Sequence, residues 1–155
     1  MTTFTKWFLL NSLMLTATFF AEQRDIISTM VENDLSYISI VIMSLYIIVS
    51  GYVGRLCYLA DRVTKEKHSP DREELLKRMD MGWFAGEHFF SLGLLGTLIG
   101  LTIATSTSLT AEAQVSNIVA GLKVGLNTAF YTTICGIVCS LPLQLQLMIL
   151  KQELE

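Results

Sequence analysis

The chain has 155 residues, of which 52% are hydrophobic and only 16% charged, and its net charge is −3. A soluble domain typically carries about 25% charged residues. Here the charges lie outside three windows, residues 35–54, 88–111 and 124–150, if His88 is neutral. Each window matches the roughly 20 apolar residues that cross a hydrocarbon core about 30 Å thick. This pattern excludes an ordinary soluble domain and predicts an all-α integral membrane protein.

Other classes of function find no support in the residues. No basic stripe with interleaved aromatic residues is present, so nucleic-acid binding is not expected. Cys57, Cys135 and Cys139 have neither the spacing of a zinc site nor that of a secreted disulfide framework. No His, Cys or carboxylate cluster lies at membrane depth. We therefore expect no enzyme, no cofactor and no metal.

The N-terminal segment, residues 1–21, leaves three interpretations open. Residues 7–21 carry no charge but form a short stretch with several polar side chains. We favour an uncleaved membrane helix, which would make four spans; the alternatives are a helix lying at the interface and a cleaved signal peptide. Cleavage after Ala21 would put Phe19 where a small residue is expected, which disfavours the signal peptide.

The distribution of Lys and Arg predicts the topology. The segment between the first two apolar windows is rich in basic residues, whereas residues 22–34 hold only Arg24. By the positive-inside rule, residues 60–88 are cytoplasmic, both short loops face outside and both termini are cytoplasmic. The predicted order is an outside loop at 22–34, a transmembrane helix at 35–59, a cytoplasmic helical segment at 60–88, transmembrane helices at 89–109 and 110–150, and a tail at 151–155.

The last two spans are expected to be parts of long helices. Ser69 and Pro70 are typical of a helix start, and apolar residues recur at helical spacing from there, so the span at 89–109 should continue the cytoplasmic helix. The final helix is expected from about Val115 to Leu150. At 1.5 Å per residue it would be about 50 Å long and would extend into the cytoplasm, with Pro142 bending it near the inner face.

Small residues recur on these two spans. Glycines let helix backbones approach closely in lipid, where packing drives helix association. We predict a helix-packing role for Gly93, Gly96, Gly100, Gly121, Gly125 and Gly136.

Threonines on the same two spans are the candidate ion-pathway residues. A single membrane threonine is often inert, because its hydroxyl bonds to the carbonyl four residues earlier. A cluster on two neighbouring helices could instead line a hydrated path. No Asp, Glu or Lys is predicted at mid-membrane, so a titratable group would have to come from another chain. Glu87 and His88 are expected near the inner boundary and Lys123 near the outer one, as anchors, although Glu87 could contribute to a cytoplasmic exit.

Two stretches carry a family resemblance. Residues 93–100, GLLGTLIG, resemble the GLLGTxxG signature of MotA/TolQ/ExbB proton channels, and residues 125–142, GLNTAFYTTICGIVCSLP, resemble the last segment of that family. Ser44 and Arg55 also lie much as a Ser and an Arg do in the first TolQ/ExbB segment. The convincing match covers residues 89–145.

The resemblance implies a pentamer in a bacterial inner membrane, around two copies of a single-span partner similar to MotB, TolR or ExbD whose membrane Asp carries the proton. Thr97 and Thr133 match the threonines that face this Asp, and we add Thr128 and Thr132 to the predicted pathway. The chain departs from the family at Thr128, where the ExbB branch has a Glu, and at Phe90, where a Pro is common. Its short cytoplasmic part argues against a flagellar role. The alternative function is a structural or pore-forming membrane oligomer without ion coupling.

Overall fold

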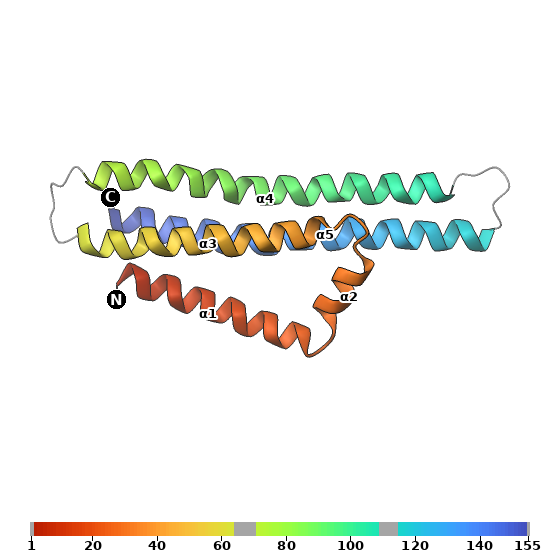
Figure 1. Ribbon diagram of the computed structural model, residues 1–155, viewed down its shortest axis with the longest axis horizontal. Helices are drawn as coiled ribbons and strands as arrows, with labels where there is room; N and C mark the ends of the chain where they lie inside the picture. Colours follow the sequence, from red (N-terminus) through yellow and green to blue (C-terminus); the bar gives the residue numbers. More distant parts are fainter. Residues whose placement is uncertain (1, 64–70, 109–114, 155) are drawn as a thin grey trace.

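The computed structural model describes residues 2–63, 71–108 and 115–154 (Figure 1). These residues form an all-α bundle of five helices: α1 (Thr3–Glu22), α2 (Ile26–Asn33), α3 (Ile38–Val63), α4 (Asp71–Ser108) and α5 (Val115–Leu154). Among the described helices, α3, α4 and α5 are long and apolar enough to cross a membrane. The all-α membrane fold is therefore confirmed. The 20-residue α1 is not among these three, so a fourth span stays a prediction.

The hairpin of α4 and α5 is the most extensively packed helix pair of the fold. The expected continuity between the cytoplasmic segment and the span at 89–109 is present, because α4 runs unbroken over 38 residues. Ser69 and Pro70, the expected helix start, lie outside the described residues. The α5 helix continues through Pro142 to Leu154, so most of the predicted tail is helical.

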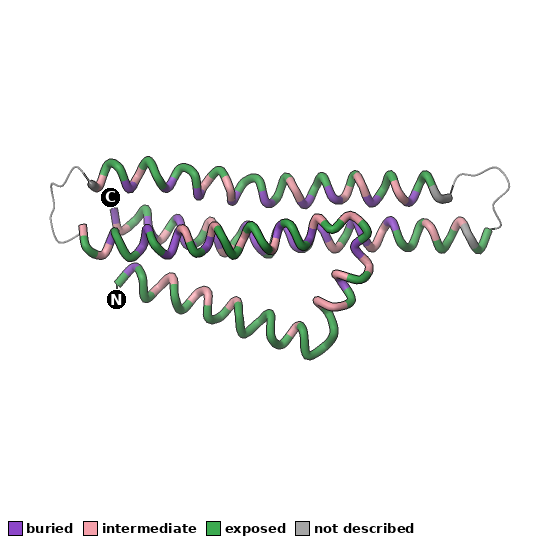
Figure 2. The backbone as a smooth tube through the Cα atoms, viewed as in Figure 1, coloured by how far each residue is buried: buried purple, intermediate pink, exposed green. Residues whose placement is uncertain are grey.

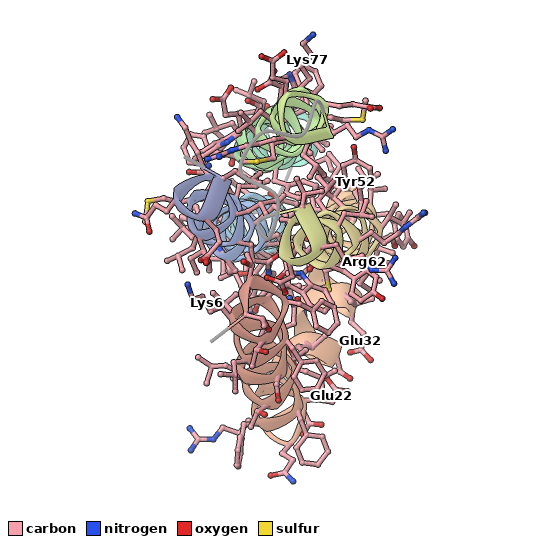
Figure 3. The ribbon with its side chains drawn as sticks, turned by 90° about the vertical axis from the view of Figure 1, so that its left-hand side faces the viewer. Lys6, Glu22, Glu32, Tyr52, Arg62 and Lys77 are labelled. Atoms are coloured by element: carbon pink, nitrogen blue, oxygen red, sulfur yellow. The ribbon has the colours of Figure 1, made fainter. Side chains whose placement is uncertain are left out.

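The α3 helix packs beside both helices of the hairpin, and α1 joins at one end only (Figures 1 and 3). Both chain termini, the end of α3 and the start of α4 lie at this same end (Figure 1). Basic side chains project there, among them Lys6, Arg62 and Lys77 (Figure 3). The expected loop at 22–34 contains the short helix α2, which leads back toward α3 and α5.

Long-range hydrogen bonds hold the first turn of α1 to the bundle. The Asp61 carboxylate accepts from the backbone amides of Thr3 and Phe4, at 2.8 and 3.0 Å, and so caps α1 from another helix. Trp7 Nε1 donates to the carbonyl of Ser50 at 3.1 Å. Farther along, α1 diverges from the bundle (Figure 1) and exposes apolar side chains such as Leu13 and Leu15.

Buried residues lie along the sides of α3, α4 and α5 that face one another (Figure 2). The outer faces of the same helices carry large exposed hydrophobic side chains, including Ile47 on α3, Leu98 on α4 and Phe130 on α5. In water, an apolar surface of this extent would be a liability. In a bilayer, a surface of this kind is suited to contact with lipid.

A tight junction before α3 places the start of this helix against α5. Asp34 is buried and accepts hydrogen bonds from the backbone amides of Ser36 and Ser39, both at 3.0 Å. Burial alone would raise the pKa of Asp34, but the hydrogen bonds from Ser36 and Ser39 outweigh it and lower the pKa from 3.8. The backbone of Tyr37 is left-handed, with φ of 56°, which turns the chain into α3.

Candidate ion pathway

Glycines bring the backbones of α4 and α5 into direct contact. A Cβ atom added at Gly96 would lie 2.5 Å from the side chain of Thr132, and one added at Gly100 would lie 2.6 Å from the backbone of Gly125 and Ala129. Gly93 and Gly136 face each other in the same interface. Gly121 is half-buried near the start of α5. No side chain larger than hydrogen fits at Gly100 unless the helices separate.

This close approach joins two threonine hydroxyls across the hairpin. The Oγ1 atoms of Thr97 on α4 and Thr133 on α5 are hydrogen-bonded to each other. Thr97 Oγ1 also lies 3.1 Å from the carbonyl oxygen of Gly93, and Thr133 Oγ1 lies 3.0 Å from that of Ala129. Both side chains are half-buried, so the pair lies at the edge of the hairpin and not in its interior.

The other two candidate threonines are fully buried. Thr132 packs against Gly96 and donates within its own helix, to the carbonyl of Thr128 at 2.9 Å or that of Ala129. Thr128 accepts from the backbone amide of Leu35 at 3.3 Å, and its hydroxyl lies 3.1 Å from the carbonyl oxygen of Asn33. The structure thus divides the four threonines into an edge pair and two interior side chains that hold helices together.

The chemistry of the edge pair suits transient contact with a proton carrier. Each hydroxyl has one proton to donate and can also accept, and four acceptor oxygens lie within reach of the two protons: the two hydroxyl oxygens themselves and the carbonyls of Gly93 and Ala129. The donor in the Thr97–Thr133 bond can therefore reverse without any movement of the backbone. In the part of the chain that the structure describes, no ionisable side chain is hydrogen-bonded to either hydroxyl.

The structure shows which residues of α3, α4 and α5 lie level with one another, which the hydropathy windows do not show. Tyr46 of α3 has its ring 6.4 Å from that of Phe89 on α4, and Ser50 Oγ lies 3.4 Å from Gln146 Oε1 on α5. The middle of the charge-free window of α3 is thus level with the segment around Glu87, at the start of the apolar window of α4. Hydropathy locates each span but does not show how far one helix is shifted along another. For this reason the sequence placed Glu87 only near the inner boundary.

A family model described as the MotA/TolQ/ExbB proton channel family matches residues 58–155, which include all of α4 and α5. No curated protein and no solved structure matches the chain.

Proposed function

The chain belongs to the MotA/TolQ/ExbB proton channel family, and from this membership we propose that it is the channel subunit of a membrane motor complex driven by the proton-motive force. In this proposal five copies surround a single-span partner, and an Asp in the membrane segment of that partner carries the proton. The complex lies in a bacterial inner membrane with both termini of this chain in the cytoplasm.

The observation that supports this function is the hydroxyl pair of Thr97 and Thr133 at the edge of a glycine-packed hairpin. A cation fixed at this place would hold a carboxylate permanently ionised. Two hydroxyls can instead hydrogen-bond to the protonated and to the ionised form of a carboxyl group, because each hydroxyl both donates and accepts. The partner's Asp could then bind and release a proton as it passes the pair. We assign Thr128 and Thr132 a structural part, since both are buried among helices of one subunit.

Exposed apolar surface on α3, α4 and α5 supports assembly of several copies. The basic side chains at the end where the termini lie support a cytoplasmic position for that end. This proposal restricts the hydrated path to one face of the hairpin, which a neighbouring subunit and the partner would complete.

The test is the composition and activity of the complex purified from its native membrane in mild detergent. We expect a mass that corresponds to five copies of this chain with a single-span partner, and proton uptake by vesicles that contain the complex. The competing function, a structural oligomer without ion coupling, predicts a stable assembly of this chain alone and vesicles that stay impermeable to protons. That combined result would refute the proposed function.

A further inference from the structure

A groove with a mostly apolar lining and three polar side chains lies on the same face of the hairpin as the Thr97–Thr133 pair, toward the chain termini. Its volume is about 420 Å³, and it is lined by Glu87, Phe90, Ile137, Ser140, Leu141 and Gln144. Along α5, Ser140 and Gln144 follow Thr133 by 7 and 11 positions, and along α4 Glu87 precedes Thr97 by 10. Spacings of 7 and 11 return to one face of an α-helix, and Phe90 also lies 7 positions before Thr97, so the groove continues the face of the threonine pair. The spacing of 10 places Glu87 about 80° round α4 from Thr97, at the side of this face.

The polar side chains of the groove are held by specific bonds. Ser140 Oγ is buried and donates to the carbonyl of Gly86 at 2.7 Å, and it accepts from Gln144 Nε2 at 2.9 Å. Ser140 thus donates its one hydroxyl proton to the backbone of α4. Gln144 uses its amide nitrogen in the bond to Ser140, and neither of these two bonds involves its carboxamide oxygen. The carboxylate of Glu87, which is exposed to the groove, is its only ionisable lining group among the described residues.

The depth of this groove along the membrane normal suits the Glu87 carboxylate to a role in proton movement. Glu87 lies two residues before Phe89, whose ring contacts Tyr46, and the charge-free window of α3 extends to both sides of Tyr46. When α3 crosses the bilayer, Glu87 lies within the depth that α3 spans. Ionisable groups at such depth are costly and usually serve ion or proton movement.

We infer that Glu87, which shares the groove with Ser140 and Gln144, is a second proton-transfer station between the threonine pair and the cytoplasm. The inference rests on the proposed channel function and deepens it. A proton that arrives through water along this face forms an O–H bond with a carboxylate oxygen of Glu87. This O–H bond then breaks as the proton passes to water on the cytoplasmic side, so the carboxylate is regenerated in each cycle and no other reactant is consumed.

The test compares proton flux into vesicles that contain the complex purified from its native membrane, with wild-type chain or with single variants. Glu87→Gln keeps the shape of the side chain but cannot take up the proton, and we expect its flux to fall by about tenfold or more, since a positioned proton-transferring side chain contributes about 10²–10⁴-fold. Glu87→Asp should retain part of the flux. Glu73→Gln, an exposed glutamate near the start of the same helix, is the matched control and should conduct normally.

The possible outcomes distinguish a failure of the Glu87 inference from a failure of the proposed channel function. If Glu87→Gln conducts like Glu73→Gln while Thr97→Val does not conduct, the station is wrong and the channel function stands. If the wild-type complex conducts no protons, both proposals fall. Dicyclohexylcarbodiimide, which modifies protonated carboxyl groups inside membranes, gives a readout that does not depend on flux. We expect its adduct on Glu87 in the wild-type chain and not in Glu87→Gln, and a wild-type chain without this adduct would overturn the inference.

Discussion

Gly100→Ala tests the close packing on which the ion pathway depends. The added Cβ would lie 2.6 Å from the backbone nitrogen of Ala129 and from the carbonyl oxygen of Gly125, and neither backbone atom can move aside as a flexible side chain would. Overpacking of this kind costs about 1–3 kcal/mol. Replacing a helical Gly by Ala gains about 0.5–1 kcal/mol, so the net loss should be about 0–2.5 kcal/mol.

Gly51→Ala on α3 is the matched control, because a Cβ at Gly51 has no atom within 4 Å. It shares the helical gain without the collision, so the difference between the two variants isolates the packing cost at about 1–3 kcal/mol. Reversible unfolding in mixed micelles of mild detergent and dodecyl sulfate, followed by circular dichroism, measures both free energies of unfolding. Equal stabilities of Gly100→Ala and Gly51→Ala would refute close contact between α4 and α5 at this point.

Three further predictions concern other parts of the bundle. Asp61→Ala removes the cap of α1, which should cost about 0.5–2 kcal/mol and speed hydrogen exchange at the start of α1 but not in α4; unchanged exchange would contradict the cap. The folded pKa of Asp34 lies below its unfolded value, so its contribution to stability is present above pH 3.8 and is lost as the pH falls through the folded pKa; Asp34→Asn should therefore destabilise the protein at neutral pH and less in acid, and an equal loss at both would argue against the charged cap. Thr132→Val should cost about 0.5–1.5 kcal/mol of stability and leave proton flux in vesicles unchanged. A flux as low as that of Thr97→Val would contradict the assignment of the pathway to the face of the Thr97–Thr133 pair.

Much of the fold follows from composition and periodicity. Each of the three helices that are long and apolar enough to cross a membrane contains a charge-free window, and the unbroken α4 follows from the regular spacing of its apolar residues across the predicted membrane boundary. The glycine spacing likewise indicated which faces of α4 and α5 would meet. These features are local, because one helix and its solvent determine them.

The rest depends on how the helices sit against one another. The sequence does not show that Thr97 bonds to Thr133 while Thr132 is buried, since all three are threonines on small-residue faces. It also does not show that Glu87 is level with the middle of the α3 window, because register depends on side-chain fit between helices. Asp61 capping α1 is a contact between residues 58 positions apart, which no local pattern encodes.

The most direct test of the central claim is proton flux through the Thr97→Val and Thr97→Ser complexes. Valine keeps the shape of threonine and removes the hydroxyl, whereas serine keeps the hydroxyl and removes the methyl group. Dye-loaded vesicles that contain the complex from the native membrane, with its mass verified for each variant, report the rate. We predict flux close to wild type for Thr97→Ser and strongly reduced flux for Thr97→Val in an intact complex. Equal flux through the two variants would contradict a pathway along the hydroxyl pair.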